Sequence, residues 1–241
     1  MEHELNSLGQ PVGLAVPDWK PARLPSGERM EGRFCALERL DGARHAADLH
    51  AANAADAEGG MWTYMGYGPF ASLKDYRAWV DAAAASRDPV WYAVIDKATG
   101  KAAGVASYLR IDAAMGTIEV GHIAWSPQLQ RTPAATEAMY LMMENAFALG
   151  YRRYEWKCNS LNAPSRAAAQ RLGFSYEGVF RQARIDKGRN RDTAWYAIID
   201  KEWPALQAAF RQWLSPANFD EHGRQRTRLS HYTSGILKQH G

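Results

Sequence analysis

The chain has 241 residues and a formal net charge of +3, with 46% hydrophobic and 23% charged residues. These values are typical of a globular protein, exclude disorder throughout the chain, and fit one domain with extensions better than two small domains. The positive charge is too sparse for the dense Lys/Arg surface of a nucleic-acid binder, so no nucleic-acid partner is expected.

Two further classes of protein are excluded by simple patterns. The only cysteines, Cys35 and Cys158, are too few for a disulfide framework and lack C-x-x-C spacing, so neither a metal site nor an oxidising compartment is expected. No stretch approaches the roughly 20 apolar residues of a membrane span, and the first 20 residues lack the apolar run of a secretory signal. We therefore expect a soluble, cytoplasmic protein without a membrane partner.

The two ends differ in composition from the middle of the chain. Residues 1–31 hold four of the eleven prolines and show no sustained period, which predicts an extended arm. Residues 215–241 are polar and irregular, which predicts a tail. Residues 32–214 are then the folded domain.

Within that domain, the periodicity predicts a strand, two helices, three strands, a helix, a strand, a helix, two strands and a last helix. In chain order these elements cover residues 33–40, 43–58, 72–86, 90–96, 102–111, 116–125, 133–149, 152–158, 162–174, 174–185, 192–200 and 202–214. Short glycine-bearing turns make strand neighbours antiparallel, whereas the helical crossover makes 116–125 and 152–158 parallel. The prediction is an α/β (α+β) fold with a mixed, mostly antiparallel central sheet and helices on both faces.

Local signals support two of the helices and place one cysteine. Ser72 is a plausible N-cap of the second helix, whose Leu73, Tyr76 and Val80 are expected on one buried stripe. The helix at 133–149 carries an apolar stripe of Ala135, Met139, Met142, Ala146 and Leu149, and it is expected to stop at Gly150. Strand 152–158 alternates cleanly, so Cys158 is expected in the core rather than as a nucleophile.

This element order, with the stretches "IEVGHIAWSP", "TEAM" and "NAPSRAAAQRLGF", resembles the GNAT acetyltransferase superfamily over residues 33 to about 200. Within the superfamily, the sequence is most similar to the branch that acetylates ribosomal-protein amino termini. The resemblance implies splayed central parallel strands, acetyl-CoA as cosubstrate and an amine as acceptor. The chain departs from the family pattern at Arg131 and Pro133, where loop glycines are usual, and at Ala169, where a tyrosine is usual.

The departure at the loop leaves a helix start that can still bind a pyrophosphate. Thr132 is a good N-cap and Pro133 a good first helical residue, and free amides at a helix start attract anions. The amides of Arg131, Thr132, Ala134 and Ala135 are expected to remain available. Arg131 can add a charge-assisted contact, or it can point into solvent beside an ordinary capped helix.

The resemblance implies a donor site that combines this loop with strand 116–125 and the helix after residue 162. Its residues are Ile123, Trp125, Gln130, Arg131, Thr132, Ala134, Ala135, Thr136, Asn162 and Ser165. Asn162 is expected to orient the pantetheine amides, having both a donor and an acceptor. Ser165 can assist the leaving thiolate or simply cap its helix.

Glu119 and His122 are the candidates for the general base. Strict alternation places them on opposite faces of the strand unless a bulge intervenes, and we favour Glu119, because GNAT enzymes often carry a carboxylate there. The alternatives are a salt-bridged glutamate and a core histidine. Trp62, Tyr64 and Phe70 of the aromatic loop are expected either to bind the acceptor or to cover the core.

The sequence thus predicts transfer of an acetyl group from acetyl-CoA to a protein amino terminus or a small-molecule amine, by direct attack in a ternary complex. The alternative is a non-catalytic acyl-CoA-binding module that kept the fold. A third possibility is a basic-tailed interaction protein, suggested by "GRQRTRLSHY" at residues 223–232. The protein is expected to be a monomer or homodimer.

Overall fold

The computed structural model describes residues 2–241 and contains one large sheet and one small hairpin. The large sheet has eight strands in the order β3-β4-β5-β6-β7-β8-β10-β9, and only β7 and β8 are parallel. The strands are β1 (Glu4–Leu5), β2 (Pro11–Val12), β3 (Met30–Glu31), β4 (Cys35–Arg39), β5 (Val90–Asp96), β6 (Lys101–Asp112), β7 (Thr117–Trp125), β8 (Arg153–Asn159), β9 (Ser175–Asp186) and β10 (Arg189–Ile199).

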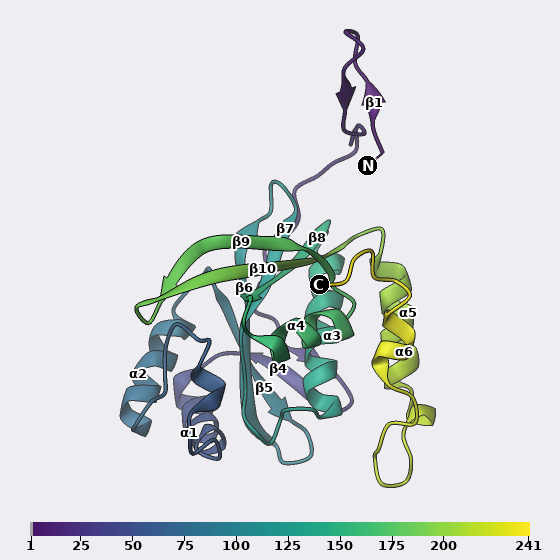
Figure 1. The fold of residues 1–241 in the computed structure, drawn as a ribbon. Helices are drawn as coiled ribbons and strands as arrows, with labels where there is room; N and C mark the ends of the chain where they lie inside the picture. The colour runs from purple at the N-terminus through teal and green to yellow at the C-terminus, as the bar shows by residue number, and fades with distance from the viewer. Residues whose placement is uncertain (1) are drawn as a thin grey trace.

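Helices cover both faces of this sheet, as predicted (Figure 1). Helices α1 and α2 lie on one face, and α3, α4, α5 and α6 lie on the other. Their bounds are α1 (Gly42–Asn53), α2 (Leu73–Ala84), α3 (Pro133–Ala148), α4 (Ala163–Arg171), α5 (Trp203–Leu214) and α6 (Leu229–Thr233), with 3₁₀ turns η1 (Gly60–Trp62) and η2 (Pro216–Asn218). The mixed, mostly antiparallel fold predicted from the sequence is confirmed.

The two parallel strands separate partway along their length. Residues Thr117–Val120 of β7 pair with Arg153–Trp156 of β8, and the pairing stops there although β7 continues to Trp125. A helix start lies after the free end of each strand, since α3 follows β7 and α4 follows β8. The splayed geometry therefore leaves backbone groups of both strands without a sheet partner.

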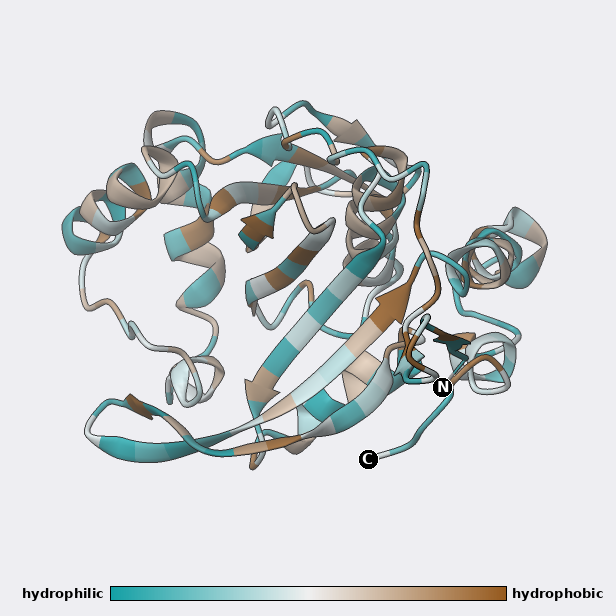
Figure 2. Ribbon diagram, turned by 90° about the horizontal axis from the view of Figure 1, so that it is seen from above, coloured by the Kyte–Doolittle hydropathy of each residue, from teal (hydrophilic) through white to brown (hydrophobic). Residues whose placement is uncertain are grey.

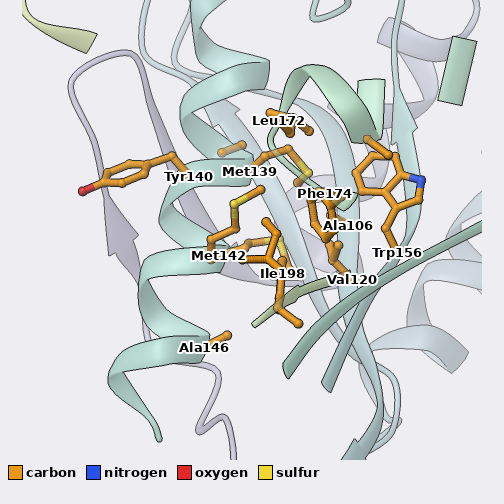
Figure 3. Packing of buried hydrophobic residues seen from close by; sticks show 14 of the residues in the cluster. Ala106, Val120, Met139, Tyr140, Met142, Ala146, Trp156, Leu172, Phe174 and Ile198 are labelled. Carbon is orange, nitrogen blue, oxygen red and sulfur yellow. The ribbon is translucent and has the colours of Figure 1, made fainter. Parts of the chain in front are cut away.

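The main core lies between the sheet and α3. Met139, Met142 and Ala146 of α3 are buried against strand residues such as Val120 and Trp156 (Figure 3). Strand residues alternate in hydropathy, as Figure 2 shows for the long strands, and β8 buries Tyr154, Trp156 and Cys158. Cys158 is thus a core residue, as predicted.

Helix α2 confirms one local prediction and corrects another. Ser72 caps the helix and exchanges hydrogen bonds with Asp75, whose amide donates to the Ser72 Oγ at 3.1 Å. Tyr76 and Val80 are buried, but Leu73 is 45% exposed, so its place on the buried stripe was wrong. Leu73 is the first residue of the helix, where the side chain is not yet enclosed by a neighbouring turn.

The two terminal segments behave differently. Hairpin β1–β2 stands away from the body (Figure 1), while Trp19 docks through its indole nitrogen, 2.8 Å from the Ala114 carbonyl. The 215–241 segment packs on α4 and α5, with Leu229 and Thr233 buried. The boundaries at residues 31 and 214 stay a prediction. Between residues 2 and 241, no helix has the length and apolarity that a bilayer crossing requires.

Candidate active site

A β-bulge in β7 brings Glu119 and His122 to the same face of the sheet. Ser107 pairs with Gly121 and Val105 with Ala124, so β7 carries one extra residue between these pairs. His122 takes a left-handed φ of 52°, which lets the strand accommodate that residue. The expectation that the two side chains face opposite ways is wrong, because alternation fails at the bulge.

Glu119 is a buried carboxylate with two cationic neighbours. It is 3% exposed, and its Oε2 lies 2.9 Å from the Lys157 Nζ and 3.0 Å from the Arg110 Nε. Burial raises the pKa of Glu119, and the charges of Lys157 and Arg110 oppose that rise. Both cations contact Oε2, whereas Oε1 faces Gly121, where Leu109 also packs and a side chain would crowd the carboxylate.

His122 lies in an aromatic cluster rather than in a hydrogen-bonded relay. Its ring stacks on Tyr67 at 5.7 Å and tilts against Trp91 at 4.6 Å between centroids. Burial, followed by the charges of Arg110, Arg184 and Arg191, lowers the pKa of His122 to about 4. The imidazole is therefore neutral at pH 7 and a weak base.

The start of α3 has the capped geometry expected of a phosphate-binding helix. The Thr132 Oγ1 accepts a hydrogen bond from the Ala135 amide at 3.2 Å, and Pro133 is the first helical residue. The Thr132 amide donates to the Leu129 carbonyl at 3.3 Å, so Thr132 and Ala135 do not offer free amides, contrary to expectation. Within residues 2–241, the amides of Arg131 and Ala134 keep no intramolecular partner.

Arg131 explains why its position usually carries glycine. Its φ of 61° is in the left-handed region, which L-residues adopt at a cost and glycine does not. The Arg131 side chain is exposed. Gln130 is exposed too, and its side-chain Nε2 donates to the Trp125 carbonyl at 2.9 Å. Thr136 is buried, and its hydroxyl lies 3.2 Å from the Arg171 guanidinium.

The start of α4 contradicts one of the two roles considered for Ser165, that of helix cap. The Asn162 Oδ1 caps the helix by accepting from the Ser165 amide at 3.1 Å, so the cap is Asn162. The Ser165 Oγ accepts from the Trp156 indole at 3.1 Å, and the Ser165 hydroxyl also hydrogen-bonds the buried Cys158 thiol. Capping occupies only the oxygen of the Asn162 amide, and its NH₂ group can still donate.

The remaining donor-site candidates lie in β7 and at the start of α3. Ile123 and Trp125 are half-buried against the main core and lie beyond the point where β7 leaves β8. Ala134 is buried at the helix start, where a small side chain permits close approach of a ligand. Ala169 is fully buried in the main core, so no acid is expected at that position.

The aromatic loop mainly covers the second core cluster, between the sheet and α1–α2. Trp62 is 4% exposed and meets Phe70 edge-on at 5.6 Å, which favours the core interpretation for both rings. Tyr64 differs, because its hydroxyl donates to the Leu161 carbonyl at 3.2 Å and so bridges this loop to the segment before α4. Tyr64 is therefore the one of these three loop residues that contacts the segment before α4.

Two residues near Glu119 and the aromatic loop were not predicted from the sequence. Lys157 is 5% exposed, lies 3.7 Å from the centre of the Trp195 ring and pairs with Glu119 and Glu155. Lys187, at the tip of hairpin β9–β10, donates to the Trp62 carbonyl at 2.9 Å and so ties the hairpin to the aromatic loop. Only the alternation of β8 could have placed Lys157 on the same face as Glu119.

Glu137, of the "TEAM" stretch, turns out to be a structural residue. Its carboxylate accepts from the amides of Arg33, Phe34 and Cys35 at 2.6–2.9 Å, which ties the first turns of α3 to β4. Elsewhere in the described chain, residues 2–241, no cluster of three or more His, Cys, Asp or Glu side chains is arranged to hold a metal ion.

Comparison with known proteins agrees with this geometry. A family model described as "Acetyltransferase (GNAT) domain" matches residues 36–175, more than half of the chain. The chain is 46% identical to a GCN5-related N-acetyltransferase from Brucella melitensis, with a TM-score of 0.88 over 90% of this chain and 99% of that one. A probable GNAT-family acetyltransferase from Chromobacterium violaceum ATCC 12472 is 40% identical, with a TM-score of 0.76 over 81% and 98% of the two chains.

Two more distant relatives set the limits of the comparison. YnaD of Bacillus subtilis (strain 168), described as an uncharacterized N-acetyltransferase, is 32% identical over 89 residues, 36% of this chain. The chain thus spans about half of that relative, 51% of its length. RimL, described as a ribosomal L7/L12 alpha-N-protein acetyltransferase, is 22% identical with a TM-score of 0.61 over 71% of this chain and 94% of that one, and so shares the fold.

The fold and the splayed strands between two capped helix starts define an acyltransferase. The chain belongs to the GNAT acetyltransferase family. The branch named from the sequence, that of the ribosomal-protein acetyltransferases, is among its structural neighbours.

Proposed function

We propose that the protein transfers an acetyl group from acetyl-CoA directly to an amine, either a protein amino terminus or a small-molecule amine, in a ternary complex. The observation that carries this proposal is the buried Glu119 carboxylate on the sheet face beside the splay of β7 and β8. The thioester of the donor and the amine of the acceptor can then meet beside Glu119. The proposal includes a cytoplasmic enzyme that needs no metal and acts as a monomer or homodimer.

The donor site fits the chemistry of coenzyme A. The unpartnered amides of Arg131 and Ala134 can donate to the pyrophosphate at the positive end of α3. The free backbone edge of β7 beyond Val120 and the Asn162 amide can hydrogen-bond an extended chain bearing amides. MccE, a protein with the same fold, was solved with acetyl-CoA and AMP, which supports this donor at the level of the fold.

Glu119 is the group that receives the proton of the attacking amine. The amine forms the new C–N bond with the thioester carbonyl, the C–S bond breaks, and the proton passes to Oε1, directly or through water. A pKa raised by burial makes the carboxylate a better acceptor than an exposed glutamate. His122, with a pKa of about 4, is less suited to this task.

Ser165 assists the leaving thiolate with a single hydrogen bond. Its Oγ accepts from Trp156, so the hydroxyl proton can turn from the Cys158 thiol to the departing thiolate. A serine hydroxyl is too weak an acid to give up its proton fully, so the thiolate takes its proton from water. Positioning by the two helix starts then supplies more of the barrier reduction than acid catalysis does.

The test is a thiol-release assay with acetyl-CoA and matched acceptors, together with calorimetry of acetyl-CoA binding. A peptide with a free amino terminus, the same peptide with a blocked terminus, and a set of small primary amines separate the acceptor classes. We expect CoA release only with free amines. Acetyl-CoA binding without release for any amine would favour the non-catalytic module, and the absence of acetyl-CoA binding would refute the donor site.

A further inference from the structure

The C-terminal segment forms a shallow, cationic cavity that is open to solvent and has no role in the proposed reaction. This cavity of about 500 Å³ is lined by Arg226, Thr227, Arg228, Ser230, His231 and Ser234. Arg226 and Arg228 are exposed, and in the described residues 2–241 neither guanidinium pairs with a carboxylate. Two unneutralised guanidinium groups in one cavity favour an anionic ligand.

The backbone between these two arginines is held by the side chain of Asn218. Asn218 is 7% exposed, and its side chain clamps Thr227 by accepting from the Thr227 amide at 2.9 Å and donating to its carbonyl at 3.2 Å. The Arg226 amide donates to the Asn218 carbonyl at 2.6 Å, and Arg228 is the residue directly before α6. The backbone at both arginines is thus held in place, and their exposed side chains extend from a fixed segment.

Two chains of contacts place this segment beside the first turns of α3. At one end, Phe219 packs on Phe34 at 5.3 Å, and the Phe34 amide donates to the Glu137 carboxylate of α3 at 2.6 Å.

At the other end, the Thr233 hydroxyl donates to the Arg171 carbonyl at 2.9 Å. The Arg171 guanidinium in turn lies 3.2 Å from the Thr136 hydroxyl of α3. The cavity lies between these two anchors, on the segment drawn in yellow beside α5 in Figure 1.

The chemistry of the donor supplies an anion that would reach beyond the helix start. Coenzyme A carries a pyrophosphate and, on the ribose of its adenosine, a separate 3′-phosphate monoester. A phosphate monoester is close to doubly charged at pH 7 and offers three strong acceptor oxygens. The amides at the start of α3 can satisfy the pyrophosphate but leave the monoester for another site.

We propose that Arg226 and Arg228 bind the 3′-phosphate of the acyl donor, so that the C-terminal segment selects coenzyme A over its 3′-dephospho form. This inference rests on the proposed donor site at α3. It assigns a binding role to the basic stretch at residues 223–232, which the sequence alone suggested only as a general interaction tail.

The experiment measures the affinities of CoA and 3′-dephospho-CoA by calorimetry at about 0.15 M salt, where long-range charge effects are screened. We expect the wild type to bind CoA roughly tenfold more tightly than 3′-dephospho-CoA, as one well-placed charge-assisted contact would give. In R226A/R228A that preference should fall to about one, with the affinity for 3′-dephospho-CoA unchanged.

K74A/R87A is the matched control. It removes two exposed cations at α2, on the opposite face of the sheet, and should leave the preference intact. The wild-type comparison needs no variant and so does not depend on folding.

Equal binding of both ligands by the wild type would overturn the 3′-phosphate site and leave the donor site standing. An equal weakening of both ligands by R226A/R228A would also overturn the 3′-phosphate site, because it would indicate a non-specific electrostatic attraction to both anionic ligands. If the wild type binds neither ligand, the proposed function fails and this inference fails with it.

Discussion

The two sides of the splayed strands are built by different means. The donor side consists of helix starts, where Thr132 and Asn162 are caps and the amides of Arg131 and Ala134 stay free. The proposed acceptor side consists of buried side chains, with Glu119 between Lys157 and Arg110, His122 among aromatic rings, and the Lys187 contact to Trp62. In the proposed function, backbone groups recognise the donor, whereas side chains from distant segments shape the acceptor site.

A substitution on the donor side leaves most of the backbone hydrogen bonds in place, so its effects should be modest. A substitution on the acceptor side alters a buried charge or a buried ring, and these are costly to disturb. We therefore expect variants of the acceptor side to lose more activity and stability than variants of the donor side.

The largest effect is expected from Glu119→Gln. The amide keeps the shape of the side chain and removes its basicity, so kcat should fall by roughly 10²–10⁴ while CoA affinity changes little. Steady-state thiol release and calorimetry measure the two quantities. Because Lys157 and Arg110 lose their shared anion, a melting curve should accompany the assay.

His122→Asn is the matched control for that result. Asparagine tolerates the left-handed φ of 52° and removes the imidazole. We expect a rate within about tenfold of the wild type, well above that of the Glu119 variant. If the order is reversed, the base is His122 and the assignment of Glu119 is wrong.

The second effect is on stability at low pH. The pKa of His122 is about 4 in the folded protein and 6.5 in an unfolded chain, so between these values only the unfolded chain takes up the proton. Stability should therefore fall as pH drops from 6.5 towards 4, by roughly 2–3 kcal/mol from this group.

Urea unfolding at about pH 7 and about pH 4.5 measures that loss. His122→Asn should lose less stability than the wild type over the same interval, by about the same amount. The raised pKa of Glu119 has the opposite effect, because the folded protein then takes up a proton more readily than the unfolded chain as the pH falls. Glu119 is present in both proteins, so its contribution cancels when their stability losses are compared. Equal losses in the two proteins would place His122 in solvent.

Most of the fold was accessible from the sequence because its signals are local. The alternation of β8, the Thr132–Pro133 start of α3 and the glycine-bearing turns each depend on neighbours within a few residues. The errors arose where tertiary structure decides. Leu73 has the right spacing but lies at a helix start, and the bulge at His122 is set by pairing with β6.

The candidate site divides in the same way. The caps at Thr132 and Asn162 follow from residue type and position. Lys157, Lys187 and Arg110 are brought to the acceptor side by pairing of distant strands and by a hairpin tip, and one sequence carries no sign of such contacts. For the same reason, the identity of the amine is not encoded in any short stretch.

The third effect tests the acid. Ser165→Ala should lower kcat about tenfold or less, because only one hydrogen bond to the thiolate is lost. CoA affinity should be nearly unchanged, since Asn162 and not Ser165 caps α4. Ser165→Thr is the control, because it keeps the hydroxyl that accepts from Trp156. A loss of several orders of magnitude with intact CoA binding would make Ser165 an indispensable acid.

The smallest effect separates backbone from charge at the phosphate loop, by comparing Arg131→Gly with Arg131→Ala. Both variants lose the guanidinium, which is exposed, so each should weaken CoA by only about 0.5–1.5 kcal/mol. Glycine removes the strain of a φ of 61°, worth about 1 kcal/mol, and part of that gain is offset by the greater entropy of the unfolded chain. Arg131→Gly should therefore unfold at a higher urea concentration than Arg131→Ala, with a free energy of unfolding about 0.5 kcal/mol greater.

Arg131→Gly should also bind CoA at least as tightly as Arg131→Ala if free amides hold the pyrophosphate. Tighter binding by the alanine variant would mean that a side chain at this position shapes the loop, and the contrast between a backbone-built donor side and a side-chain-built acceptor side would fail.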